Sequence, residues 1–118
     1  MKKGIRKVVI FGNNLEKIDR HKKTIKKFLK KKRLAREYYI LSSPPTEGNI
    51  AGIRSLEYLI SVMVTSDVDG SLLKEIKKLC TVKVFRPWEI DSFNKNLVKE
   101  AEEWKWKQSL NSSPLINT

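Results

Sequence analysis

Lysine and arginine side chains gather on one predicted helix, over residues 15–36, where they could bind a polyanion. The first 36 residues hold fifteen of the chain's twenty-five Lys and Arg residues and only two carboxylates, whereas the remainder of the chain holds ten cations and eleven carboxylates. The chain is therefore basic because of one element. The side chains that form the cationic face of this helix, or directly follow it, are Arg20, Lys23, Lys26, Lys27, Lys30, Lys31 and Arg33.

The spacing of these cations indicates what they could bind. Lysines four positions apart, such as Lys23 and Lys27, repel each other by about a few tenths of a kcal/mol, and a row of phosphates would relieve that repulsion. We therefore expect nucleic acid or another polyanion as the partner, held through its phosphates because the cations are mostly lysine. The alternative hypothesis is a solvated helix without a partner. Further cations that we expect to extend the surface are Lys2, Lys3, Arg6, Lys7 and Arg86.

A pair of carboxylates, Asp67 and Asp69, follows an apolar stretch and precedes Gly70. Residues 67–73 resemble the first motif of haloacid-dehalogenase-type phosphatases, which implies a nucleophilic Asp67, a general acid in Asp69 and a bound Mg²⁺. The chain departs from that family because two strand–helix units precede the motif. The pair is also similar to the paired aspartates of Toprim-type nucleic-acid domains, but the Glu expected at the end of the first strand is replaced by Phe11. A turn after a strand favours Asp and Gly for structural reasons as well.

The composition makes several kinds of site improbable. The single cysteine, Cys80, cannot form an internal disulfide and fits a reducing compartment. With one histidine, His21, a zinc site of the Cys/His type is not expected. No apolar run approaches the roughly 20 residues that span a bilayer, and no signal-peptide core follows the first residues. We therefore expect a cytoplasmic, non-enzymatic binding module with no cofactor and no metal.

Apolar periodicity predicts four strand–helix units in a single domain over residues 1–108, followed by a flexible tail over residues 109–118. The predicted strands span residues 7–11, 38–41, 59–65 and 82–85, and the predicted helices span residues 15–36, 50–58 and 71–80, with a last helix that begins near Ile90. The third strand is apolar on both faces, which is typical of a parallel sheet covered on both sides. We therefore predict an α/β fold, a three-layer Rossmann-like or flavodoxin-like sandwich with a four-stranded parallel sheet and β-α repeated four times.

In such a fold, the loops that follow the strands meet at the carboxyl edge of the sheet, where ligands of open α/β sheets bind. Four predicted loops lie there, over residues 12–14, 42–49, 65–70 and 86–88. As an alternative to the polyanion hypothesis, we consider a sensor of a nucleotide-like small ligand at this edge. Its candidate binding residues are Asn13, Ser42, Ser43, Thr65, Asp67, Asp69, Arg86 and Trp88.

Four short stretches resemble a family of small bacterial and archaeal Rossmann-like domains that is catalogued as a conserved domain of unknown function. They comprise residues 8–18, 62–67, 74–80 and 82–88. The family pattern has a strand ending in glycines, a central strand closing on Thr-Asp with a His nearby, a helix with a lysine-rich end, and a last strand running into an Arg and an aromatic residue. This chain departs from it by having a single glycine in the first loop and no His after the aspartate. The resemblance implies the fold and leaves the ligand open.

Overall fold

The computed structural model describes residues 6–112, including the side chains of residues 6–103. Its strands are β1 (Arg6–Phe11), β2 (Tyr38–Ser43), β3 (Leu59–Val64) and β4 (Lys83–Phe85). Its helices are α1 (Leu15–Lys31), α2 (Glu47–Gly52), α3 (Gly70–Leu79) and α4 (Ile90–Ser112), with two short 3-10 helices, η1 (Ile53–Ser55) and η2 (Pro87–Glu89). No helix in this part of the chain is long and apolar enough to cross a membrane.

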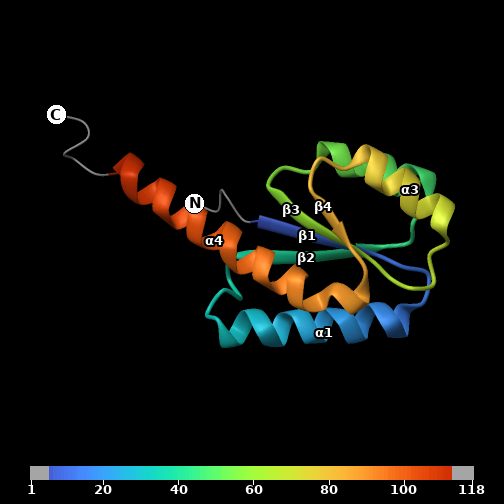
Figure 1. The fold of residues 1–118 in the computed structure, drawn as a ribbon, viewed down its shortest axis with the longest axis horizontal. Helices are drawn as coiled ribbons and strands as arrows, with labels where there is room; N and C mark the ends of the chain where they lie inside the picture. Colours follow the sequence, from blue (N-terminus) through green and yellow to red (C-terminus); the bar gives the residue numbers. More distant parts are fainter. Residues whose placement is uncertain (1–5, 113–118) are drawn as a thin grey trace.

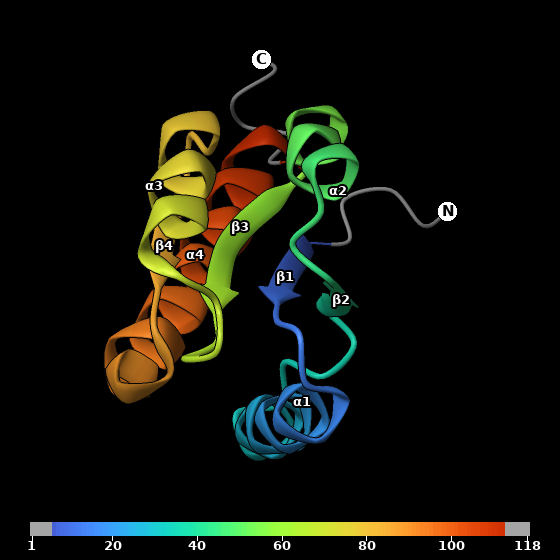
Figure 2. The same ribbon diagram turned by 90° about the vertical axis from the view of Figure 1, so that its right-hand side faces the viewer.

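The four strands form one parallel sheet in the order β2-β1-β3-β4. The predicted α/β fold with a four-stranded parallel sheet and alternating strands and helices is therefore confirmed. Helices α1 and α4 cover one face of the sheet, and α2 and α3 cover the other (Figure 1, Figure 2). The strand order reverses between β1 and β3, which is the point where open α/β sheets usually bind ligands.

Each face of the sheet has its own apolar core, because successive strand residues point to opposite faces. Ile10 of β1 joins Ile25 of α1 and Leu97 of α4 in the core between the sheet and these two helices. The next residue, Phe11, joins Ile76 of α3 in the core on the other face. The central strand β1 is thus buried on both sides over residues 8–11, as the apolar run there predicts.

Helix α4 packs against the sheet through an aromatic pair and a buried hydrogen bond. The rings of Phe85 and Phe93 meet edge to face, with centroids 5.4 Å apart and an interplanar angle of 88°. The Tyr38 hydroxyl of β2 donates to the Leu97 carbonyl oxygen over 2.6 Å. Burial raises the pKa of Tyr38 well above its ordinary value, so the hydroxyl keeps the proton that it donates.

The second predicted helix begins earlier than residue 50. Helix α2 starts at Glu47, inside the predicted loop over residues 42–49, because the Thr46 side-chain oxygen accepts a hydrogen bond from the Asn49 backbone N–H over 3.2 Å and caps the helix. The 3-10 helix η1 then replaces the last turns that periodicity predicts.

The ends of the first and last helices also differ from the prediction. Helix α1 ends at Lys31, before the predicted end at residue 36, and Leu15 at its start is 76% exposed because contact with the sheet begins one turn later, at Ile18. Helix α4 continues to Ser112, so it includes the first residues of the predicted tail. Apolar periodicity in the sequence also predicts Trp104 on the core face of this helix, but its side chain and the rest of the predicted tail lie outside the described residues.

Candidate nucleic-acid interface on helix α1

The amphipathic sequence of α1 determines which of its sides faces solvent. The Asn14 side-chain oxygen accepts a hydrogen bond from the Lys17 backbone N–H over 3.1 Å and caps the first turn. Ile18, Ile25 and Leu29 are buried against the sheet. Because these three residues occupy one face, the lysines at the intervening positions point away from it.

The seven predicted cations are all exposed, and we call them the α1 cationic surface. Within the described part of the chain, none of these seven side chains takes part in an ion pair or a side-chain hydrogen bond. Positions Lys23, Lys27 and Lys31 form a row along the helix about 12 Å long, at a rise of about 1.5 Å per residue. Their charges are therefore available to a partner of similar length and opposite sign.

The end of α1 places Arg33 in an unfavourable backbone conformation. Arg33 has a φ of 62°, the left-handed region in which a side chain costs about 1 kcal/mol. The Arg33 N–H donates to the Lys30 carbonyl oxygen over 3.1 Å, and the Leu34 N–H donates to the Leu29 carbonyl oxygen over 2.7 Å. This is the Schellman arrangement, which most often has glycine where this chain has Arg33.

A groove of about 550 Å³ between α1 and α4 adjoins the cationic surface. Lys32 lies on the α1 side of the groove, with its Nζ 5.9 Å from the centroid of the Phe28 ring. Helix α4 contributes Lys95 and Lys99, which sequence reasoning missed because α4 carries both signs of charge. The carboxylates of Asp91 and Glu102 also line the groove, so the cationic surface does not continue unbroken across it.

Three further predicted cations, Arg6, Lys7 and Arg86, have partners elsewhere in the fold. Arg6 is only 3% exposed, and its Nη1 lies 2.9 Å from Glu37 Oε1 in an ion pair. Lys7 Nζ donates to the Glu57 carbonyl oxygen over 2.9 Å. Arg86 Nη2 donates to the Thr65 carbonyl oxygen over 3.3 Å. The prediction was therefore wrong for Arg6, because it counted the charge without its tertiary partner, whereas for Lys7 and Arg86 it stays a prediction. Lys2 and Lys3 lie outside the described residues.

The predicted small-ligand edge is held together by its own polar side chains. Asp67 Oδ1 accepts hydrogen bonds from the Thr65 hydroxyl and, over 3.5 Å, from the Asn13 backbone N–H. The Asn13 side-chain amide donates to the Asp67 carbonyl oxygen over 3.2 Å, and Lys17 Nζ donates to Ser66 Oγ over 3.3 Å. These contacts tie the loop after β1 to the loop after β3, and Thr65 itself is fully buried.

The other candidate residues at this edge have local structural contacts. Asp69 Oδ1 accepts from the backbone N–H groups of Ser71 and Leu72, each over 3.0 Å, and so caps α3. The Arg86 guanidinium stacks over the ring of Trp88, 5.0 Å from the centroid, although Trp88 is 70% exposed.

Ser42 is exposed and Ser43 is half-buried at the end of β2. The structure thus brings Asn13, Thr65, Asp67 and Arg86 into one hydrogen-bonded group. Within residues 6–112, no three Asp, Glu, His or Cys side chains lie close enough to hold a metal ion.

Hydrogen bonding to the carboxylate lowers the pKa of Asp67. The Thr65 hydroxyl has the largest effect, and the backbone N–H groups of Asn13 and Asn14 add to it against the opposing effect of burial. The N–H groups at the start of α3 lower the pKa of Asp69 in the same way. Both carboxylates are therefore ionised at neutral pH and act as acceptors, which favours structural roles for them.

We expect the contribution of Asp67 to stability to vanish in acid. Because the folded state lowers its pKa, the carboxylate stabilises the fold above the ordinary value of about 3.9, and this is lost as the pH falls through the lower folded value. Asp67→Asn should therefore reduce the free energy of unfolding at about pH 7 but have a smaller effect at about pH 3. Guanidinium unfolding of both proteins measures this difference, and an equal difference at the two pH values would contradict it.

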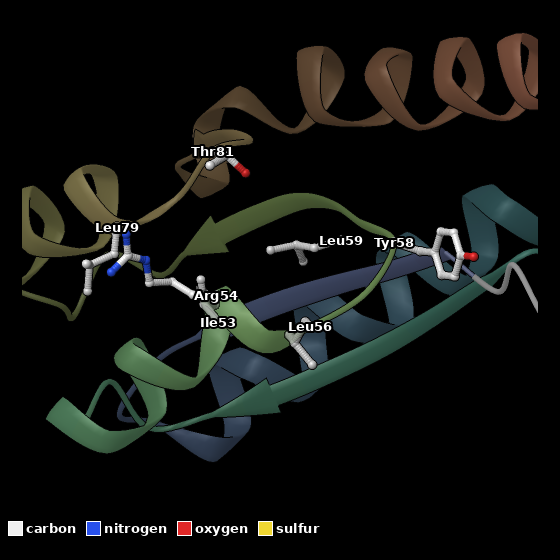
Figure 3. A pocket seen from close by; sticks show the side chains of 7 residues that line it. All are labelled: Ile53, Arg54, Leu56, Tyr58, Leu59, Leu79 and Thr81. Carbon is white, nitrogen blue, oxygen red and sulfur yellow. The ribbon is translucent and has the colours of Figure 1, made fainter.

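A separate hollow of about 350 Å³ lies at the amino ends of β3 and β4, away from the carboxyl edge (Figure 3). Its lining is mixed: apolar side chains such as Leu56 and Leu79 stand beside polar ones, and among the described residues Arg54 is the one charged side chain that lines it. Tyr58, which also lines it, has a φ of 60°. Sequence reasoning did not point to this hollow because its residues come from the ends of three elements.

No family model matches the chain, and no curated protein or solved structure matches it significantly. The resemblance to the small Rossmann-like family therefore stays a prediction. The fold and the exposed charges define this protein as a parallel α/β domain with a cationic helix on one face of its sheet.

Proposed function

We propose that this domain is a non-enzymatic binding module that binds nucleic acid through the α1 cationic surface. The observation that carries the proposal is that seven exposed cations stand on and just after one helix, without ion-pair partners in residues 6–112. Such a surface contacts phosphates whatever the base sequence, because a lysine ammonium carries charge but no fixed pattern of donors for a base edge.

Arg33 supports this proposal independently of the lysines. A glycine at the same backbone position would relieve about 1 kcal/mol of strain, and Arg33 makes no ion pair within the described residues that offsets this cost. The cost is understandable when the guanidinium is used for binding, since unfavourable backbone conformations concentrate at functional sites.

The proposal is tested by titrating the intact protein into a short fluorescent DNA or RNA oligonucleotide at several salt concentrations. We expect binding at low ionic strength, with log affinity falling linearly as log salt rises, by about 0.9 for each phosphate neutralised on a duplex. Fluorescence anisotropy measures the affinity. An absence of salt-sensitive binding to any duplex or single strand would overturn the proposal.

Arg33→Gly should raise stability and weaken binding at the same time. Glycine removes the left-handed strain, so thermal unfolding should show a gain of about 1 kcal/mol, while the loss of one cation should reduce the salt slope by up to about 0.9. The opposite signs separate a binding role from a structural one. If the variant is stabilised but binds nucleic acid as the wild type does, Arg33 is not part of the interface.

A further inference from the structure

Strand β2 forms an edge of the sheet with backbone groups that point outward. The Arg6 N–H donates to the Glu37 carbonyl oxygen over 3.1 Å, and the Gly12 N–H donates to the Ser43 carbonyl oxygen over 3.3 Å. Because alternate residues of a strand turn their N–H and C=O groups to opposite sides, the residues between these two bonds that face away from β1 are Tyr38, Ile40 and Ser42.

Within the described residues, no strand pairs with this outer side of β2, which lies at one end of the sheet order (Figure 2). The pairing of β1 with β2 runs without a bulge from Arg6–Tyr38 to Phe11–Ser43, and β2 itself contains no charged residue. Charges and bulges are the features that usually protect such an edge from another strand. The opposite edge, β4, is protected by its length of three residues.

The two sides of the β2 edge differ in chemistry. On the α1 side, a hollow of about 300 Å³ lies between the helix and the strand, and Lys26 and Lys30 stand beside it with Leu29. On the other side of the sheet, Tyr39 is 58% exposed and Leu41 is half-buried against the second core. A strand added here would therefore meet ammonium groups on one face and apolar surface on the other.

We propose that the β2 edge binds an extended acidic peptide segment of another protein, which adds to the sheet as a further strand. Because side chains alternate along a strand, the segment should carry acidic residues at every second position, facing Lys26 and Lys30. The intervening residues should be apolar, facing Tyr39 and Leu41. Main-chain hydrogen bonds then supply affinity, and the alternating side chains supply specificity.

Charge argues against a second copy of this chain as the occupant. Antiparallel pairing of β2 with β2 of another molecule, about a two-fold axis perpendicular to the sheet, would bring Lys26 and Lys30 of both copies to one side of the joined sheet. No carboxylate in β2 would neutralise them. The proposal goes beyond nucleic-acid binding and does not rest on it.

The test uses the full chain and a fluorescent eight-residue peptide that alternates Glu and Val. Its controls are a peptide of the same composition with the Glu and Val residues in two blocks, and an alternating Lys and Val peptide. Fluorescence anisotropy should show the alternating Glu peptide binding about tenfold or more tightly than either control. Only this peptide can place its Glu residues beside the two lysines and its Val residues on the apolar face while its backbone pairs with β2. Equal binding of the two Glu peptides would overturn the proposal.

Ser42→Pro removes one outward N–H and leaves the hydrogen bonds to β1 intact, because proline has no N–H. It should weaken peptide binding roughly tenfold, whereas Ser42→Thr, which keeps the N–H, should bind as the wild type does. If proline impairs folding, the double variant Lys26→Gln, Lys30→Gln tests the proposal instead. It should weaken binding of the alternating Glu peptide. Unfolding curves verify that each variant is folded.

Two further outcomes separate the competing occupants. Ser42→Pro should leave nucleic-acid binding unchanged. The nucleic-acid proposal and the acidic-strand proposal can therefore fail independently of each other. Undiminished peptide binding by both the folded Ser42→Pro protein and the double lysine variant would overturn the acidic-strand proposal. A wild-type dimer in sedimentation that Ser42→Pro converts to a monomer would also overturn it, in favour of a second copy at this edge.

Discussion

Replacing Lys23, Lys27, Lys30 and Lys31 by Gln is expected to remove most of the affinity of this protein for nucleic acid at low salt. If each lysine neutralises one phosphate, the variant loses up to about 3.6 from the slope of log affinity against log salt on duplex DNA. If the two proteins bind equally at about 1 M salt, the affinity of the variant at about 0.1 M is lower by up to roughly 4 × 10³-fold. Stability should change little or rise slightly, because the substitutions also remove like-charge repulsion along the helix.

A matched variant distinguishes a local surface from net charge. Four exposed lysines lie on helix α3, which covers the face of the sheet opposite α1, and on strand β4, at the edge opposite β2 (Figure 2). They are Lys74, Lys77, Lys78 and Lys83. Their replacement by Gln changes the net charge of the protein by the same amount, but we expect it to leave the salt slope close to that of the wild type. If both quadruple variants lost affinity equally, the α1 cationic surface would not be the binding site.

Gly12→Ala is expected to destabilise the fold by about 3 kcal/mol, the upper range for forcing extra volume into a packed site. A Cβ at Gly12 would lie 2.6 Å from the Thr65 hydroxyl oxygen and 3.0 Å from Ile18 Cγ1. Rotation of the Thr65 side chain offers no relief, because its methyl carbon would already lie 3.0 Å away. The melting temperature should fall by roughly 12 °C, at about 4 °C per kcal/mol for a domain of this size.

Two comparisons test the cause of this loss. Gly48 lies exposed within α2 and a Cβ there meets no atom within 4 Å, so Gly48→Ala should stabilise the protein by about 0.5–1 kcal/mol through helix propensity. Thr65→Ala in the Gly12→Ala background removes the closest contacts, so the double variant should lose less stability than the sum of the single changes. Simple additivity would contradict a steric cause.

The architecture was predictable because its signals are local. Three of the four strands are short apolar runs, and their lengths and spacing leave room for a helix between each pair. Caps also follow from nearby residues, as with Asn14 at the start of α1 and Asp69 at the start of α3. Where two local signals compete, the boundary of an element is harder to predict. The Thr46 cap starts α2 at Glu47, inside a segment whose turn residues predict a loop.

The α1 cationic surface was predictable for a related reason. A helix with one buried face must turn its remaining side chains to solvent, so Lys23, Lys27 and Lys31 are exposed wherever the helix packs. For the carboxyl edge of the sheet, the sequence predicted which loops meet there but not which contacts their side chains make. Whether Thr65 and Asp67 there point to solvent or to each other depends on how the loops after β1 and β3 meet.

The sequence by itself determined the order of elements and the seven exposed cations, because each depends on residues a few positions apart. The alternation of strands and helices then implied a parallel sheet. The tertiary structure decided which cations are exposed to a binding partner. Pairing of β1 with β2 sets Arg6 beside Tyr38 and near Glu37, and it buries a guanidinium that the chain alone counts as surface. It also decided that β2 has an open edge, since strand order depends on contacts between distant segments that no local pattern contains.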